Sequence, residues 1–180
     1  MPGDAARSSI PTEPAPTELG RQRRARMARR GFVTVLVAFL ALGALGFVGV
    51  RTRTASASGG GYELSLHYAT IARPGLDVPW TLTVRHPGGF PDGVTVLVTS
   101  EYLDKLDQNG ASPAPAAETT DGERTIWRFG PPPGDVLTIS LDAQIQSGVQ
   151  FTRVKGRVEV VAGSSRAATT GLDFSTLVMP

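Results

Sequence analysis

Length, composition and charge exclude several classes of protein. The chain has 180 residues, of which 19% are charged, with 21 Gly, 14 Pro and no Cys. This length suits one folded domain with appendages, and the abundance of turn-forming residues favours an all-β fold over a coiled coil or helical bundle. The absence of Cys excludes disulfides, thiolate metal sites and thiol nucleophiles.

The charge is distributed unevenly along the chain. Residues 1–30 hold seven Arg against three acidic residues, whereas residues 58–180 hold nine Lys and Arg against thirteen Asp and Glu. The basic character therefore belongs to the N-terminal segment. A domain that binds nucleic acid needs a basic patch on its folded part, so we expect no nucleic-acid partner.

Residues 1–30 are predicted to be a disordered, basic cytoplasmic tail. The first twenty are rich in Pro, Ala, Ser, Thr and Glu and lack apolar periodicity, a composition that does not bury enough apolar surface to fold. The last ten contain arginines that we expect to contact anionic lipid head groups at the membrane surface: Arg21, Arg23, Arg24, Arg26, Arg29 and Arg30.

Residues 31–50 form an uncharged run in which Thr34 is the only polar side chain. Twenty helical residues span about 30 Å, the thickness of the hydrocarbon core of a bilayer. The run therefore predicts one transmembrane helix. Six arginines precede it closely and only Arg51 and Arg53 follow it, so the N-terminus is expected in the cytoplasm and the rest outside the cell membrane.

Two alternatives concern export. Residues 55–57 read Ala-Ser-Ala, a possible signal-peptidase site, but the apolar run is longer than that of a signal peptide, and Arg51 and Arg53 interrupt the approach to the site. Arg29 and Arg30 stand before the apolar run as in a twin-arginine export signal. The sequence leaves cleavage after Ala57, and the choice between the general secretory and twin-arginine routes, open.

Residues 51–61 are small and polar and end in three glycines. This composition predicts a flexible linker between the helix and the domain that follows.

Residues 62–180 are predicted to form an extracytoplasmic β-sandwich. Apolar and polar residues alternate in several short segments, for example Leu64 and Leu66 with Ser65 and His67, and alternation of this kind indicates half-buried strands. Gly, Pro, Asn and Asp clusters separate the segments. Seven to eight short strands without an intervening helix are typical of an immunoglobulin-like sandwich. We expect Trp80 and Trp127 in its core.

Part of this pattern consists of a Pro74-Gly75 turn, the strand 78–84, the strand 93–98, and a later tryptophan, glycine turn and strand at 127–130, 133–134 and 137–141. This combination, over about residues 74–161, resembles the conserved-repeat immunoglobulin-like domain of bacterial surface proteins. The chain departs from the family pattern at 86–88 and 101–104. The resemblance implies an immunoglobulin-like fold and a surface location, and it implies no catalytic residues.

The longest interruption of the strand pattern, residues 104–124, is the candidate binding loop for a partner or ligand. Long loops in compact domains are often functional. Its candidate residues are Asp104, Asp107, Asn109, Asp121 and Glu123. Residues 107–110 resemble a fragment of a calcium loop but lack the complete pattern and its bidentate Glu. The two histidines, His67 and His86, have no third ligand at a suitable spacing, so we expect no cofactor, metal or catalytic residue.

These observations lead to one expected function and one alternative. The first is a non-enzymatic accessory protein, anchored in the bilayer, whose outer domain binds another membrane protein or a cell-envelope component. The alternative is a sensor domain that binds a small ligand or Ca²⁺ through residues 104–124. The sequence does not identify the partner or the oligomeric state.

Overall fold

The computed structural model describes residues 16–44, 49–162 and 169–179, with side chains from residue 24 onward. The chain divides into two compact units, residues 1–48 and residues 49–180. We describe each unit separately.

The first unit contains helix α1 (Pro16–Ala44). Its part from Arg24 to Ala44 is long and apolar enough to cross a membrane, and none of it is buried by the rest of the chain. The prediction of one apolar N-terminal helix is therefore confirmed. Thr34, its polar side chain in the apolar part, donates a hydrogen bond from Oγ1 to the carbonyl oxygen of Arg30 at 2.9 Å, which satisfies that hydroxyl inside the helix.

Both predicted boundaries of this region need correction. Residues 16–30 are helical, so the predicted disorder is wrong for them, because Arg, Gln, Leu and Ala are strong helix formers and extend the helix. The rest of the predicted tail, residues 1–15, lies outside the described residues. Helix α1 ends at Ala44, and Gly49 and Val50 are not helical, so the predicted helix end at Val50 is also wrong.

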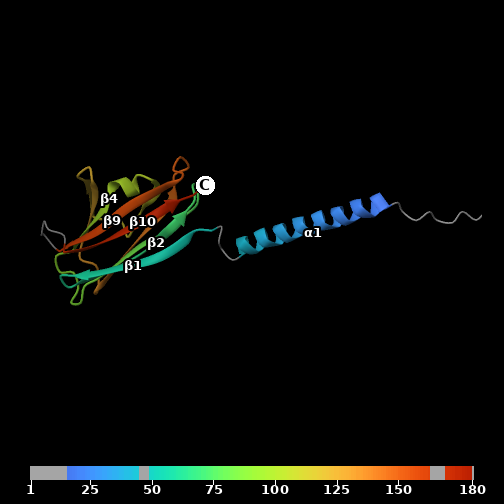
Figure 1. Ribbon diagram of the computed structural model, residues 1–180. Helices are drawn as coiled ribbons and strands as arrows, with labels where there is room; N and C mark the ends of the chain where they lie inside the picture. The colour runs from blue at the N-terminus through green and yellow to red at the C-terminus, as the bar shows by residue number, and fades with distance from the viewer. Residues whose placement is uncertain (1–15, 45–48, 163–168, 180) are drawn as a thin grey trace, which may run out of the picture. The chain divides into compact units, whose positions relative to one another are not determined.

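The second unit is almost entirely β (Figure 1). Its elements are β1 (Arg51–Gly59), β2 (Tyr62–Ala72), β3 (Trp80–Arg85), β4 (Val94–Thr99), α2 (Ser100–Leu103), β5 (Leu106–Ser112), β6 (Ala117–Thr120), β7 (Arg124–Phe129), β8 (Val136–Ile145), β9 (Thr152–Ala162) and β10 (Thr170–Val178). The strands form one sheet in the order β5-β8-β3-β2-β10-β9-β4-β7-β6, and β1 pairs with β2 outside this path.

Strand β1 corrects the predicted flexible linker at residues 51–61. Its residues pair with β2 from Arg51 opposite Ile71 to Gly59 opposite Tyr62. Gly60 and Gly61 have φ values of 56° and 85°, as a two-residue type I′ hairpin turn requires. The alternation that identifies β1 is carried by small residues, because Ala55 and Ala57 pack against the core while Ser56 and Ser58 are exposed.

The predicted all-β domain is confirmed. The hydrogen bonds join its strands into one sheet, whereas an immunoglobulin-like sandwich has two separate sheets. Strands β2 and β10 run parallel and pair at only two positions, Ile71 with Leu177 and Ala72 with Val178. The other strand pairs in the sheet are antiparallel. This short parallel pairing joins the two groups of strands into one sheet that curls into a half-barrel.

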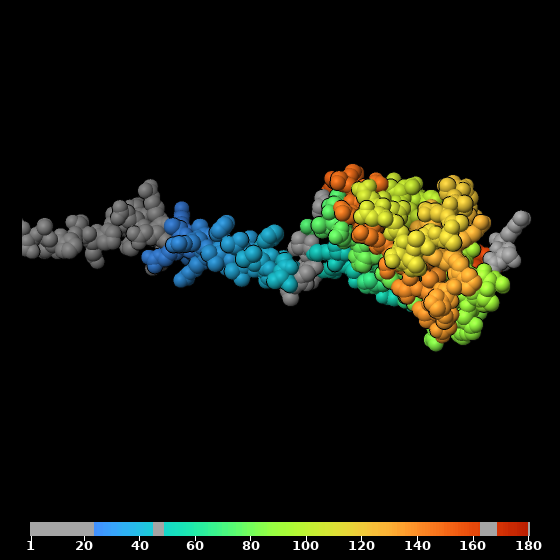
Figure 2. All heavy atoms as spheres, turned by 180° about the vertical axis from the view of Figure 1, so that it is seen from behind, coloured from blue at the N-terminus to red at the C-terminus, as the bar shows by residue number. Residues whose placement is uncertain are grey.

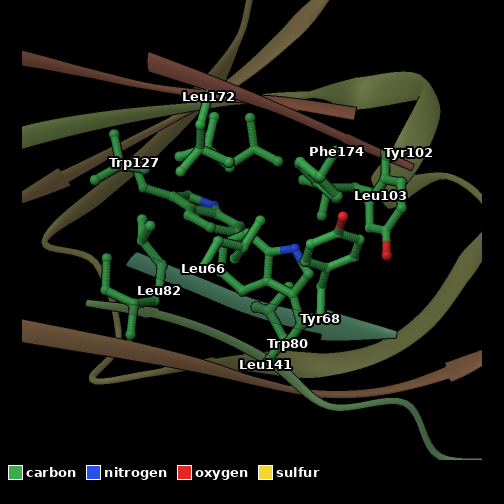
Figure 3. Close-up of a cluster of buried hydrophobic side chains, with 14 of the residues drawn as sticks. Leu66, Tyr68, Trp80, Leu82, Tyr102, Leu103, Trp127, Leu141, Leu172 and Phe174 are labelled. Atoms are coloured by element: carbon green, nitrogen blue, oxygen red, sulfur yellow. The ribbon is translucent and has the colours of Figure 1, made fainter. Parts of the chain in front are cut away.

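The curl brings distant strands into contact in the core (Figure 3). Trp80 on β3 and Trp127 on β7 are separated by four strands in the sheet order. Their ring centroids nevertheless lie 6.0 Å apart with the rings at 88°, an edge-to-face geometry that aromatic pairs favour. Each tryptophan is only 1% exposed, which confirms the prediction that both belong to the core.

A buried hydrogen-bond chain braces the junction of β2 and β10. Thr176 Oγ1 donates to the carbonyl oxygen of Ala69 at 2.6 Å, and the hydroxyl of Tyr102, from α2, lies 3.1 Å from the same Oγ1. Because Thr176 uses its proton on Ala69, the Tyr102 hydroxyl is the donor to Thr176. Burial raises the pKa of Tyr102 above its ordinary value.

Replacing Thr176 by Val keeps the shape of the side chain but leaves the Ala69 carbonyl and the Tyr102 hydroxyl without this partner. We expect the free energy of unfolding to fall by about 2–4 kcal/mol, because each unsatisfied buried group costs about 1–3 kcal/mol. Thr176→Ser keeps the hydroxyl and should lose about 1 kcal/mol for the missing methyl group. Thr138→Val, at an exposed position of β8, is the control, and urea unfolding is the measurement. Equal losses for Thr176→Val and Thr176→Ser would contradict the brace.

The raised pKa of Tyr102 predicts a loss of stability in alkali. The folded chain holds the phenol proton more tightly than the unfolded chain, whose tyrosine pKa is about 10. The stabilising contribution is therefore complete below that pKa and declines as the pH rises above it. Unfolding curves of the wild type and of Tyr102→Phe, taken from about pH 9 to about pH 11, should show a smaller decline for the variant. Parallel declines would contradict the assignment.

Candidate functional site

The predicted binding loop at residues 104–124 contains regular structure. Strands β5 and β6 occupy most of it, and each pairs with a single neighbour, β5 with β8 and β6 with β7. The prediction of a long loop is therefore wrong. These strands lack apolar alternation because they lie at the two ends of the sheet order, where Leu106 is the only buried residue of β5 and all of β6 is exposed.

A hollow of about 530 Å³ lies between these two strands. Its walls come from α2, β5, β6 and the start of β7, and we call it the β5–β6 hollow. The lining residues are Ser100, Leu103, Asp104, Gln108, Glu118, Thr119, Thr120, Gly122 and Thr125. In Figure 2 the yellow-green and yellow atoms of this part of the chain lie together on the face turned to the viewer.

Of the five predicted loop residues, one lines this hollow. Asp104 lines it directly. Asp107 and Asn109 flank the lining residue Gln108, and Asp121 and Glu123 flank the lining residue Gly122. Successive side chains of a strand point to opposite faces, so of the five residues the structure places only Asp104 in the hollow. A binding role for the other four stays a prediction. Gln108 and Glu118 also line the hollow, and nothing in their spacing marks them as site residues in the sequence.

Two of the five side chains have structural partners. The backbone N–H groups of Glu123 and Arg124 donate to Asp121 Oδ1, and the Arg124 guanidinium donates to Asp121 Oδ2 at 3.0 Å. These bonds close the β6–β7 turn and lower the pKa of Asp121, with the backbone N–H of Arg124 as the largest cause. Asn109 Nδ2 donates to Asp142 Oδ2 at 3.4 Å, which ties β5 to β8.

Two carboxylates in the lining make the hollow negatively charged. Asp104 and Glu118 are both exposed, and the described lining residues include no Lys, Arg or His. The other polar side chains of the lining are hydroxyls and an amide, which donate and accept hydrogen bonds. Such a surface suits cationic groups and hydrogen-bond donors. Within residues 16–44, 49–162 and 169–179, no group of three His, Cys, Asp or Glu residues is placed to hold a metal ion.

Both histidines have structural roles. His86 stacks on Tyr62 with ring centroids 4.3 Å apart, and its Nδ1 lies 2.5 Å from the carbonyl oxygen of Gly89, to which it donates. His67 Nδ1 lies 3.3 Å from Thr54 Oγ1, across the β1–β2 pair. The two rings thus hold a turn and a strand pair on separate parts of the sheet.

The arginines predicted to contact the membrane surface belong to α1. Arg24, Arg26, Arg29 and Arg30 have exposed side chains, and Arg21 and Arg23 lie in the preceding turns of the same helix. The structure contains no lipid, so their contact with head groups stays a prediction.

Comparisons with known proteins do not assign a family. No family profile matches the sequence, and no curated protein matches it. A solved structure of AvmM, described as catalysing macrocyclization in alchivemycin A biosynthesis, is similar over 73% of this chain and 89% of its own, with 8% sequence identity and a TM-score of 0.39. A similarity at this level carries no argument about fold or activity.

Proposed function

We propose that this protein is a non-enzymatic, single-pass membrane protein whose β domain lies outside the cytoplasm and binds a cationic segment of another membrane or envelope protein in the β5–β6 hollow. The observation that carries the proposal is the uncovered apolar surface of α1.

Phe32, Val35 and Phe39 show why this helix needs an apolar environment. They are 67%, 68% and 65% exposed, and burying a side chain of this kind is worth about 1.5–3 kcal/mol. The β domain builds its core from its own strands. A lipid bilayer supplies the missing burial for the whole apolar part of the helix.

The charges around the helix support the proposed orientation. Four arginines with exposed side chains precede the apolar part of α1, at positions 24, 26, 29 and 30. Positive residues beside a membrane span stay on the cytoplasmic side. The β domain is then extracytoplasmic, which also agrees with the surface location that the resemblance to immunoglobulin-like repeat domains implies.

The β5–β6 hollow supports a binding role for the domain. Exposed carboxylates and hydroxyl groups both line it. It is flanked by β5 and β6, and each of these strands pairs with one neighbouring strand and has its other edge unpaired. An unpaired strand edge presents backbone donors and acceptors to another chain. A cationic segment therefore finds both charge and hydrogen-bond partners at this place.

The membrane anchor is testable by extraction. We expect the protein to stay in the membrane pellet during alkaline carbonate washing and to run at the full 18.9 kDa. Replacing Phe39 and Leu40 together by Lys should release it, because each charge near the centre of a span costs about 2.5–3.5 kcal/mol. Replacing both residues by Met is the control. A shortened chain in the soluble fraction would show a cleaved signal sequence and contradict the anchor.

The binding role is testable by site-specific crosslinking in native membranes. A photoreactive amino acid at Thr119, on β6, should capture a partner, whereas the same group at the exposed Thr138 on β8 should not. Asp104→Lys with Glu118→Lys should reduce the capture at least about tenfold, which corresponds to about 1.4 kcal/mol.

Asp92→Lys, at an exposed position away from the hollow, is the matched charge control and should leave the capture unchanged. Equal capture from Thr119 and Thr138, or insensitivity to the double charge reversal, would contradict binding at the hollow. Melting temperatures of all variants check that the fold is intact.

A further inference from the structure

One end of the β domain combines exposed apolar side chains with positive charge. At this end β1 and β9 begin and β2 and β10 end, as the pairing of Arg51 with Ile71, Ile71 with Leu177, and Leu177 with Arg153 shows. Strand β8 also ends there, because the N–H of Gly75, just after β2, donates to the carbonyl oxygen of Ile145. We call it the basal end. It is the end at which the chain coming from α1 enters the domain.

Three large apolar side chains project from the turns of the basal end. Phe151, Leu76 and Met179 are 79%, 45% and 43% exposed. Backbone bonds hold these turns together, since the N–H of Met179 donates to the carbonyl of Ala72, and the N–H of Ile145 donates to the carbonyl of Leu76. Thr152 pairs with Val178, so Phe151 and Met179 continue neighbouring strands.

Phe151 is held in an unusual backbone conformation. Its φ is 48°, and it is the only non-glycine residue with positive φ among the described residues. This conformation is unfavourable for an L-residue with a Cβ. A strained backbone that leaves a phenyl ring in solvent indicates a function for that exposed ring.

The charge of the basal end is divided between two sides. On the side formed by β1, β2, β9 and β10, the segments 49–54, 71–77, 146–155 and 175–179 carry Arg51, Arg53, Arg73, Arg153 and Lys155 against Asp77. Residues 100–107 and 121–124 lie toward the same end, because Leu106 pairs with Ile145 and Thr99 pairs with Arg124, and this other side is acidic, with Lys105 and Arg124 against Glu101, Asp104, Asp107, Asp121 and Glu123. The positive charge thus belongs to the side that carries the first residues of the domain. The segments at the opposite end, 58–63, 85–94, 129–136, 160–162 and 169–171, carry Arg85 against Glu63, Asp92 and Asp135. None of the ion pairs among the described residues uses Arg53, Arg73, Arg153 or Lys155.

The covalent chain limits how far the basal end can lie from the bilayer. Arg51 follows Ala44, the last described residue of α1, by seven residues. Seven extended residues reach at most about 25 Å. If α1 is the membrane anchor that we propose, its own tether keeps the basal end within reach of the lipid head groups.

From these observations we infer that the basal end is a membrane-contact surface: Phe151, Met179 and Leu76 insert between the lipid head groups, and Arg53, Arg73, Arg153 and Lys155 bind their phosphates. Apolar burial together with electrostatic attraction is how peripheral elements bind the interface of anionic membranes. The inference rests on the proposed anchor.

The test uses the full chain in vesicles of phosphatidylcholine and phosphatidylglycerol. Because the chain has no Cys, Gln150→Cys gives a single fluorescent label beside Phe151, and Asp92→Cys gives a matched exposed label at the opposite end. Lipids brominated near the head group should quench the label at position 150 at least about threefold more than the label at position 92, because only the first label lies close to the head groups.

Two variants, both made in the Gln150→Cys background, separate the apolar contribution to lipid contact from the electrostatic one. Replacing Phe151 and Met179 by Ser should reduce quenching in all vesicles, and replacing Arg153 and Lys155 by Gln should reduce it mainly when phosphatidylglycerol is present. Equal quenching of the two labels in protein that stays in the vesicle pellet would overturn the lipid contact alone. Release of the protein from the pellet would overturn the anchor and this inference together.

Discussion

The parallel pairing of β2 with β10 is the constraint on which the rest of the domain depends. Only two residue pairs make it, and a buried threonine hydroxyl bonded to the Ala69 carbonyl reinforces it from the core side. Without this junction the strands would form two independent groups of five. With it, the two groups share one continuous sheet, and the sheet must fold over so that β3 and β7 face each other across the Trp80–Trp127 contact.

The same constraint accounts for the distribution of surface chemistry. A curled sheet that does not close leaves its two terminal strands facing one another, and here these are the short polar strands β5 and β6. Their carboxylates and hydroxyls gather around the hollow. The middle of the sheet, where β2 and β10 end, carries the cations and the exposed apolar turns. The domain is therefore polarised between the centre of its strand order and its ends.

The sequence predicts the half-buried strands well, because their apolar alternation reflects a buried and an exposed face. Strands β2, β3 and β8, the apolar helix and the two core tryptophans all follow from such local patterns. The sequence does not predict strand β1, because Ala55 and Ala57 are too small to produce a clear apolar alternation. It does not predict β5 and β6 either, because edge strands with few buried residues lack apolar alternation. The pairing of Ile71 with Leu177 depends on residues far apart in the chain, so local periodicity does not encode it. For the candidate site, the sequence marks Asp104, which lines the hollow, but it marks neither Glu118 nor the facing strands that form the walls.

The β1–β2 hairpin has a mechanical consequence for a domain held by its N-terminal side. Backbone hydrogen bonds between antiparallel strands lie perpendicular to the strands. A force applied at Arg51 along the length of β1 therefore loads the hydrogen bonds between this nine-residue strand and β2 at the same time, instead of breaking them one after another. The first strand of the domain is thus arranged as a shear clamp, able to transmit tension from the chain before it into the sheet without peeling away.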